Sequence, residues 1–272
     1  MQPRPYLSLV VPVYNEEQCI RQSLQTVLAY LDGKPYRAEV ILVDDGSHDG
    51  TVQVIEEVAK AENRLRLIRN DHRGKAFAVR TGMLAALGDY VIFADADLAT
   101  PIHQTAKLLT TLESGYDVAI GSREGYGARR VGEPWLRHFM GRAFNLVVRL
   151  LVMGNHRDTQ CGFKGFTWGA TQDVFSSVRL YGPDSPLLTT AALTGFDVEL
   201  LYLSHRKGYR VAEIPVEWHY GPGSKVNPWR DSWRNFRDVL RVRYYALRGL
   251  YSTPGDESQE SGVRRQESRR DA

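Results

Sequence analysis

The chain has 272 residues, of which 43% are hydrophobic and 25% are charged. These values exclude a fibrous, collagen-like or wholly disordered chain, and the length is enough to bury a full core without disulfide bonds. Two cysteines, Cys19 and Cys161, are too few for a disulfide scaffold. The N-terminus does not resemble a signal peptide, and no window reaches the ~20 apolar residues of a membrane-spanning helix. We therefore expect a cytoplasmic protein that does not cross a bilayer.

The net charge of +3 hides an uneven distribution along the chain. Residues 121–165 carry eight basic and three acidic side chains, and residues 206–250 carry ten and four. Basic residues therefore gather in the second half, where we expect them to meet phosphate groups or an anionic membrane surface. We expect no nucleic acid partner.

The first ~120 residues alternate between strand and helix patterns, which predicts a mostly parallel sheet with helices on both faces. Strands are predicted where apolar residues run together, at residues 7–11, 40–43, 65–68 and 90–94. Helices are predicted where apolar residues recur every three or four positions, at residues 20–31, 51–61 and 74–87. The predicted fold class is therefore α/β, with a Rossmann-like central sheet flanked by helices.

The second half has a less regular pattern. Strands are predicted at residues 117–120, 163–167 and 209–218, and helices at residues 134–153, 171–178 and 196–207. A last helix, residues 229–250, carries most of its arginines on one face, and the residues predicted to share another face are Phe236, Val239, Leu240, Tyr244 and Leu247. Such a basic amphipathic helix either lies on an anionic membrane or packs against the domain. The polar tail from residue 253 is predicted to be disordered.

Polar side chains follow three of the predicted strands at their carboxyl ends. These clusters are Tyr14-Asn15-Glu16, Asp44-Asp45 and Asp95-Ala96-Asp97. In open α/β sheets ligands bind just beyond such strand ends, so the clusters predict one acidic crevice. Two carboxylates one residue apart, Asp95 and Asp97, suit Mg²⁺ or Mn²⁺ held together with substrate phosphates. Taken alone, an Asp-x-Asp pair is also common in solvated turns.

Four ordered motifs surround these clusters. They are Val11-Pro12-Val13-Tyr14-Asn15-Glu16, Val43-Asp44-Asp45-Gly46-Ser47, Arg73-Gly74-Lys75 and Ala94-Asp95-Ala96-Asp97-Leu98. Over residues 6–125 this series resembles the nucleotide-sugar domain of family 2 inverting glycosyltransferases, which have the GT-A fold. The resemblance implies a metal-dependent enzyme that takes a sugar from a nucleotide donor.

The resemblance also implies a role for each residue of the crevice. The residues implied at the base and nucleoside are Pro12, Tyr14, Glu16, Asp44 and Asp45. Those implied at the ribose, the diphosphate and the metal are Lys75, Asp95, Ala96 and Asp97, with Asp95 and Asp97 as metal ligands. Asp45 also fits a turn or helix cap, and Lys75 also fits an ordinary solvated lysine.

The second half is similar to the polyprenyl-phosphate sugar synthases, and most of all to the dolichyl-phosphate β-glucosyltransferases. The matching stretches are Gly121-Ser122-Arg123, residues 158–164, residues 196–201, and Gly223-Ser224-Lys225 after Trp218. Mannosyl members usually carry Gln where this chain has Ala99. The resemblance therefore favours UDP-glucose as the donor, with GDP-mannose as the alternative.

A polyprenyl-phosphate acceptor would explain the basic second half, because cationic side chains pair with phosphate oxygens. The candidates for holding its phosphate are Arg123, Arg137, Arg142 and Lys225. The candidate catalytic residues are Asp97, Arg123, Lys225 and Asp197. On the helix that contains them, Arg137 and Arg142 fit a solvated face equally well.

The need for a general base depends on the acceptor. A phosphate monoester is largely ionised near neutral pH, so its attack needs little help from a base. A hydroxyl acceptor, the alternative within the same family, would require Asp197 or Glu199 as a true base. Both residues fit helix-capping or core positions at least as well. His72, His103, His138 and His156 show no metal-ligand spacing and are predicted to be surface or network residues.

The predicted organisation has three parts: a GT-A domain at residues 1–227, a basic amphipathic helix at residues 228–252 and a tail at residues 253–272. Within the domain, residues 6–125 would bind the nucleotide sugar and residues 126–227 the acceptor. We expect the protein to be peripheral on the cytoplasmic face of a membrane, attached through a helix or a membrane-protein partner. The rival interpretations are a catalytically inactive sugar-nucleotide-binding module and a nucleotidyltransferase, which would usually have a glycine-rich basic loop near the N-terminus.

Overall fold

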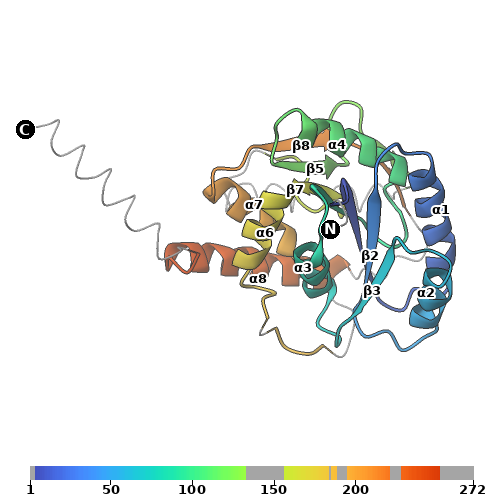
Figure 1. Cartoon of the computed structure of the whole chain (residues 1–272). Helices are drawn as coiled ribbons and strands as arrows, with labels where there is room; N and C mark the ends of the chain where they lie inside the picture. Colours follow the sequence, from blue (N-terminus) through green and yellow to red (C-terminus); the bar gives the residue numbers. More distant parts are fainter. Residues whose placement is uncertain (1–3, 133–155, 184, 189–194, 221–227, 252–272) are drawn as a thin grey trace, which may run out of the picture.

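A computed structural model describes residues 4–132, 156–183, 185–188, 195–220 and 228–251 (Figure 1). Its centre is a seven-stranded sheet, whose strands in spatial order are β3 (Leu65–Arg69), β2 (Ala38–Asp44), β1 (Leu7–Val13), β4 (Tyr90–Phe93), β7 (Lys164–Thr167), β5 (Val118–Ser122) and β8 (Val211–Pro215). A second sheet pairs β6 (Arg129–Val131) with β9 (Glu217–His219).

The first half of the main sheet is parallel throughout. β1 pairs with β2 and β4, and β2 pairs with β3. Every residue of β1 is buried, as expected for a strand that helices cover on both faces. Because parallel strands end at the same edge of a sheet, the segments after Val13, Asp44 and Phe93 meet there.

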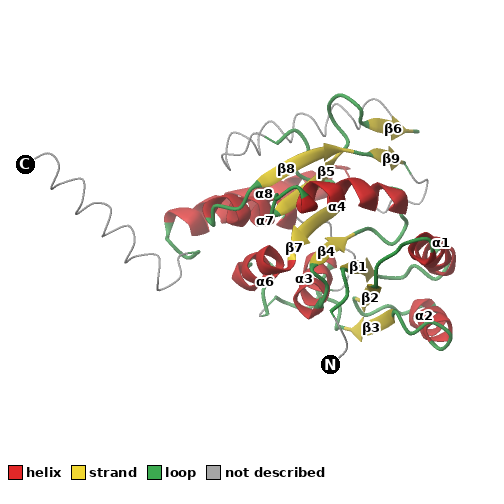
Figure 2. Ribbon diagram, turned by 45° about the horizontal axis from the view of Figure 1, so that its top comes forward, coloured by secondary structure: helices red, strands yellow, loops and turns green. Residues whose placement is uncertain are grey.

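Helices cover the sheet in two layers (Figure 2). One face carries α1 (Ile20–Asp32), α2 (Thr51–Ala59) and α4 (Thr105–Glu113). The other carries α3 (Lys75–Ala85), α6 (Trp168–Ser177), α7 (Phe196–Arg206) and α8 (Pro228–Leu247). Successive strand residues point to opposite faces of the sheet, so Leu9 and Val11 pack against the first layer of helices and Val10 against the second. Among the described helices, none is both long enough and apolar enough to cross a bilayer.

The antiparallel strand β7 joins the two halves of the sheet. It pairs with β4 on one side and with β5 on the other, and β5 in turn pairs in parallel with β8. The register places Lys164 opposite both Phe93 and Ile120. The start of β7 therefore lies beside the carboxyl end of β4, where Asp95 and Asp97 follow.

The predicted α/β class and mostly parallel central sheet are confirmed, and the predicted elements differ in three places, one of which is β6, a strand that was not predicted. The single strand predicted at residues 209–218 is two strands, β8 and β9, in separate sheets. The chain changes sheet at buried Val216, whose N–H donates to the Ser122 carbonyl at 2.9 Å. The helix α4 was not predicted, although Leu108, Leu109 and Leu112 give it a buried apolar side. The predicted helix at residues 134–153 and the predicted tail lie outside the described residues.

The apolar face predicted for the last helix is also divided in the structure. Val239 of α8 is fully buried against the domain. Leu240, Tyr244 and Leu247 are instead exposed, because helical spacing places them about 80–140° around the axis from Val239, away from the domain. The predicted residues do lie within about 140° of the helix circumference, but the domain fully buries only Val239, at the edge of that arc.

Candidate active site

The three predicted polar clusters lie at one edge of the sheet, after β1, β2 and β4. Two non-glycine residues there have a positive φ, Asn15 at 53° and Leu98 at 49°. Side chains rarely adopt this conformation, and such strain is concentrated at functional sites. At this edge, Leu98 closes a turn in which its N–H donates to the Asp95 carbonyl at 3.0 Å. This turn holds Asp95 and Asp97 close together at the end of β4.

Asp95 and Asp97 form a compact charged group with Lys75. The ammonium of Lys75, at the first residue of α3, makes an ion pair with the Asp95 carboxylate. Asp97 Oδ1 accepts a hydrogen bond from the N–H of Ala99 at 3.0 Å, which orients its carboxylate. Burial and then the charge of Asp95 raise the pKa of Asp97. Burial is the largest single effect on the pKa of Lys75 and lowers it, but the carboxylates of Asp95, Asp197 and Asp97 together outweigh burial and raise that pKa.

The carboxylate of Asp95 occupies space that a glycine leaves open. A Cβ on Gly162 would lie 2.3 Å from Asp95 Oδ2, closer than real Cβ contacts. The segment at the start of β7 therefore packs directly on the end of β4. Any side chain at position 162 would displace the carboxylate.

The group has the chemistry of a divalent-metal site completed by a substrate. Its carboxylate oxygens are hard ligands, and the mutual charge that raises the pKa of Asp97 is what a cation would relieve. Within the described part of the chain, no cluster of three or more His, Cys, Asp or Glu side chains could enclose a metal alone. Asp95 and Asp97 therefore fit Mg²⁺ or Mn²⁺ whose remaining ligands are diphosphate oxygens and water.

The two aspartates at the end of β2 are both buried, and their carboxylates bind different segments. Asp44 accepts hydrogen bonds from the N–H groups of Gly46 and Ser47 at 3.2 Å. Asp45 reaches across to the loop before α3, where it accepts from the N–H groups of Arg73 and Gly74 at 2.9 and 2.8 Å. Burial raises the pKa of Asp45, although these hydrogen bonds oppose the shift. The carboxylate of Asp45 therefore ties two loops together, whereas the turn of the alternative interpretation is held by Asp44.

His72 connects Asp45 with the aromatic ring of Tyr14. The rings of His72 and Tyr14 stack with centroids 4.1 Å apart and planes 5° apart. His72 Nδ1 lies 2.8 Å from Asp45 Oδ2, and because an ionised carboxylate only accepts, Nδ1 is the protonated nitrogen. Among the described residues, Nε2 has no hydrogen-bond partner. Asp45 and His72 together fix the plane of the Tyr14 ring.

We call the sheet edge with Tyr14, Asp44, Asp45, Asp95 and Asp97, where a sugar donor is predicted to bind, the donor edge. The other residues predicted to bind the donor also lie there. Pro12 lies within buried β1, opposite Val43 of β2. The N–H of Glu16 donates to Thr51 Oγ1 at 2.8 Å, and the negative charge of Glu16 acts on Asp97. Ala96 lies between the two metal-ligand candidates and is 7% exposed. The structure thus brings the predicted nucleotide-sugar residues of β1, β2 and β4 to one edge.

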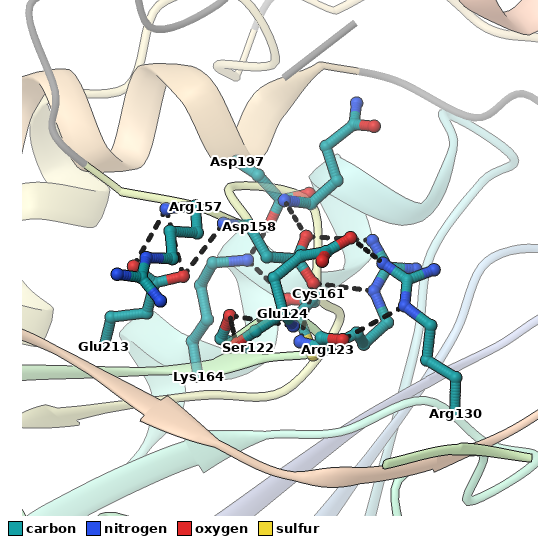
Figure 3. Close-up of polar contacts among 11 residues, drawn as sticks. Ser122, Arg123, Glu124, Arg130, Arg157, Asp158, Cys161, Lys164, Asp197 and Glu213 are labelled. Carbon is teal, nitrogen blue, oxygen red and sulfur yellow. Dashed lines mark hydrogen bonds and ion pairs between the residues drawn. The ribbon is translucent and has the colours of Figure 1, made fainter. Parts of the chain in front are cut away.

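Arg123, a predicted acceptor ligand, is bound by a buried carboxylate (Figure 3). Its Nε and Nη2 atoms donate to Asp158 Oδ2 and Oδ1 at 2.7 and 2.9 Å. Asp158 is fully buried, which alone would raise its pKa, but the pair with Arg123 brings the pKa down to about 2. The guanidinium carbon of Arg123 also lies 5.4 Å from the centroid of the Trp218 ring. Asp158 thus holds Arg123 in one orientation.

Asp197, a predicted catalytic residue, pairs with a lysine that is itself fully buried. Lys164 Nζ lies 2.5 Å from Asp197 Oδ1 and donates to the carbonyl of Cys161. Burial raises the pKa of Asp197, and the charge of Lys164 offsets part of that rise. Asp197 also acts electrostatically on Lys75 and Asp95. Residues 158–164 therefore link Arg123, through Asp158, to Asp95, against which Gly162 packs. Figure 3 shows the part of this link from Arg123 to Lys164 and Asp197.

Glu199 has a different environment from Asp197, although only one residue separates them. Its carboxylate accepts from the N–H of Arg179 at 2.9 Å and from the Tyr251 hydroxyl at 2.7 Å. It is fully buried, and burial raises its pKa. These are the contacts of the core-network alternative. The other acceptor candidates, Arg137, Arg142 and Lys225, lie outside the described residues.

Sequence reasoning missed three residues that shape this site: His72, Gly162 and Lys164. The signal for Lys164 was a lysine inside an apolar strand, which is typical of a buried ion pair. Gly162 stands in a stretch already singled out, but no local pattern shows that Asp95 needs its space. For His72, a surface or network position was predicted, but its contacts with Asp45 and Tyr14 were not.

The family described as Glycosyl transferase family 2 matches residues 8–175, which include both clusters of aspartates and the link to Arg123. The chain belongs to glycosyl transferase family 2. The resemblance predicted from the ordered motifs is thereby confirmed, and with it an enzyme of the glycosyltransferase class.

Curated relatives carry the likeness along most of the chain. A dolichyl-phosphate beta-glucosyltransferase of Drosophila melanogaster is 35% identical over 92% of this chain and 78% of its own. The Saccharomyces cerevisiae protein of that name is 34% identical over 90% and 76%. This likeness includes the second half, where the acceptor residues are predicted.

Solved structures with low identity share the fold. Glucosyl-3-phosphoglycerate synthase from Mycobacterium tuberculosis, in complex with Mn²⁺, UDP and glucosyl-3-phosphoglycerate, has a TM-score of 0.61 at 19% identity, covering 88% of this chain and 80% of that one. The mannosyltransferase PcManGT from Pyrobaculum calidifontis, with GDP-Man and Mn²⁺, has a TM-score of 0.55 at 21% identity, covering 88% and 65%. The GT-A architecture of the chain agrees with both.

Proposed function

We propose that this enzyme transfers glucose from UDP-glucose to a polyprenyl phosphate, with a divalent metal ion and with inversion at the anomeric carbon. The observation that carries the proposal is the link of residues 158–164 between the carboxylates of the donor edge and the cationic Arg123. The names of the relatives at 34–35% identity, dolichyl-phosphate beta-glucosyltransferases, support the choice of sugar and acceptor.

The reaction needs one bond to form and one to break. An oxygen of the acceptor phosphate attacks the anomeric carbon of glucose, on the face opposite the bond to UDP. That bond breaks with its electron pair on the diphosphate oxygen, so UDP departs and the configuration inverts. The phosphate nucleophile is already ionised near neutral pH, and no proton has to be removed from it.

The residues of the chain then contribute positioning and charge. Lys75 lies beside Asp95, where its ammonium can stabilise the negative charge that grows on the leaving diphosphate. Asp95 and Asp97 would hold the metal ion, which supplies a Lewis acid at the same diphosphate. Arg123, fixed by Asp158, would orient the acceptor phosphate, with Lys225 as a second cation.

The environment of Asp197 supports a phosphate acceptor over a hydroxyl. A general base must be able to take a proton from the nucleophile. Asp197 is buried and its carboxylate is engaged by Lys164, so its role is to balance the charge of that buried lysine. A reaction that needs no base fits this arrangement.

The test is transfer of labelled sugar into lipid. Purified protein is incubated with Mg²⁺ or Mn²⁺, a polyprenyl phosphate and radiolabelled UDP-glucose or GDP-mannose in parallel, and label in the organic phase is counted. We expect label from UDP-glucose alone, and none after chelation of the metal. Label from GDP-mannose alone would overturn the donor, and binding of UDP-glucose without lipid labelling from either donor would overturn the acceptor.

A further inference from the structure

The helix α8 has one face that is fixed to the domain. Val239 and Val242 are 0% and 1% exposed, and Val242 packs in the layer that contains α7. The residue before Val239 adds a polar attachment: the carboxylate of Asp238 accepts from the Tyr181 hydroxyl at 2.6 Å and from the N–H of Gly195 at 3.0 Å. These contacts set how the helix is rotated about its axis.

The opposite face carries large apolar side chains in contact with solvent. Trp233, Leu240, Tyr244 and Leu247 are 64%, 44%, 52% and 74% exposed. Steps of seven, four and three residues at about 100° each place all four within about 60° of one another around the helix. Figures 1 and 2 show α8 extending past the sheet at one side of the domain. We call these four residues the α8 stripe.

Arginines flank the α8 stripe on both sides. Arg237 and Arg241 follow one side of it and Arg243 the other, at the angles that helical spacing gives, and all three are exposed. From Trp233 to Leu247 the sequence has one acidic residue, Asp238, and it is buried on the domain side. The exposed face of the helix is therefore apolar in the middle and cationic at its edges.

We propose that the α8 stripe docks in the surface of an anionic phospholipid membrane. An interfacial helix buries its apolar side among the acyl chains while its flanking cations bind lipid phosphates, and this face has both parts. A second copy of the chain is a less suitable partner for this face. In a two-fold symmetric contact the arginines beside the stripe of one copy would lie near those of the other, and their like charges would repel. The proposal rests on the proposed function in one respect, since a lipid acceptor has to be met at a membrane.

The test uses the full chain and vesicles without polyprenyl phosphate or nucleotide sugar. Flotation is measured with phosphatidylcholine vesicles and with vesicles that also contain about 30% phosphatidylserine, an anionic lipid. We expect the wild type to float with the anionic vesicles, and less strongly as salt screens the charges. The variant Leu240→Ser/Tyr244→Ser/Leu247→Ser should lose at least about tenfold in partitioning. The variant Arg237→Gln/Arg241→Gln/Arg243→Gln should lose about fivefold per arginine at low salt.

A matched control removes exposed apolar side chains from elsewhere. The variant Leu87→Ser/Tyr126→Ser/Leu187→Ser changes residues that are 52%, 101% and 64% exposed, and it should float like the wild type. All three variants alter exposed side chains, so thermal unfolding should be nearly unchanged.

Three results would overturn the docking proposal. Two of them concern flotation: equal flotation of the stripe variant and the wild type, and no flotation of the wild type at all. The other is a wild-type dimer in lipid-free solution that the stripe variant abolishes, which would assign the face to a second copy. A protein that floats through the stripe but transfers no glucose would instead contradict the proposed function and leave the docking surface standing.

Discussion

The donor edge and the acceptor side of this site are built in different ways. At the donor edge, Asp44, Asp95 and Asp97 each lie at or just beyond the end of a parallel strand, and the sheet alone brings them together. On the acceptor side, Arg123 and Lys164 are held by Asp158 and Asp197, partners 35 and 33 residues away along the chain. Local strand ends form the first region, and buried ion pairs over long sequence distances form the second.

The difference teaches how to interpret charged residues in this family of folds. A carboxylate at a parallel strand end is available to a ligand because the sheet stops there. A charged residue in the less regular half can owe its place to another charge, as Asp197 does to Lys164. Substitutions at the donor edge should therefore mainly lower catalytic activity, and substitutions of the buried ion pairs on the acceptor side should mainly lower stability.

The largest effect is expected from Asp158→Asn, which leaves the guanidinium of Arg123 without its buried partner. We expect a loss of about 3–5 kcal/mol in the free energy of unfolding at neutral pH, measured by urea denaturation. Because the folded pKa of Asp158 is about 2, below the ordinary value of about 3.9, its contribution is complete above about pH 4 and is lost as the pH falls through 2. The difference between wild type and variant should shrink over that interval.

The control for this substitution is Asp173→Asn, which breaks a more exposed pair. The Asp173 side chain is 46% exposed and lies 2.8 Å from Lys207 Nζ. Its loss should cost less than about 1 kcal/mol. An equal loss in the free energy of unfolding for the two variants would contradict the idea that burial makes the Arg123–Asp158 pair more important for stability.

The next largest effect is expected from Asp97→Asn at the donor edge. Loss of the metal-ligand charge should lower kcat for glucose transfer by about 10²–10³-fold while the melting temperature stays near that of the wild type. The raised pKa of Asp97 in the metal-free protein also predicts that protons compete with the metal ion as the pH falls, so the metal concentration for half-maximal activity should increase at low pH. Asp89→Asn, an exposed change at the other end of β4, should leave kcat unchanged. A fully active Asp97→Asn enzyme would remove Asp97 from the reaction.

A smaller effect is expected from Gly162→Ala, where the two regions touch. The new Cβ would push the Asp95 carboxylate away from Lys75, and we expect kcat to fall by about 10–100-fold, since small displacements of positioned groups are costly. Gly169→Ala is the matched control, because nothing lies within 4 Å of a Cβ there. Equal kcat values for the two alanine variants would mean that Asp95 tolerates the displacement.

The smallest effect is expected from His72→Ala, which frees the ring of Tyr14. The KM for UDP-glucose should rise about five- to tenfold, whereas kcat and the KM for the acceptor stay constant. His72→Phe keeps an aromatic ring against Tyr14 and should recover most of the donor KM. His48→Ala, an exposed change in the neighbouring turn, should have no effect. A purely structural role for His72 would change the melting temperature and leave the KM of the alanine variant unaltered.

The sequence allowed the parallel sheet and the donor edge to be predicted because both follow from short-range patterns. Apolar runs mark β1, β2 and β4, and the residues directly after them are the candidates of the site. The stacking of His72 on Tyr14 and the space that Gly162 leaves for Asp95 join segments distant in sequence, and no spacing reveals them. For α8, periodicity identified the helix but not its rotation, which the buried contacts of Asp238 determine.

The place of β7 between β4 and β5 has a consequence for how the chain folds as it is synthesised. Strands β1 to β4 can pair among themselves as soon as they have been made, and only β4 still lacks one of its neighbours, β7. β5 has to wait, because both of its neighbours, β7 and β8, come later in the chain. A nascent chain that ends shortly after Ser122 therefore exposes both edges of β5 and the edge of β4 that later pairs with β7. Such unpaired edges promote aggregation and attract chaperones.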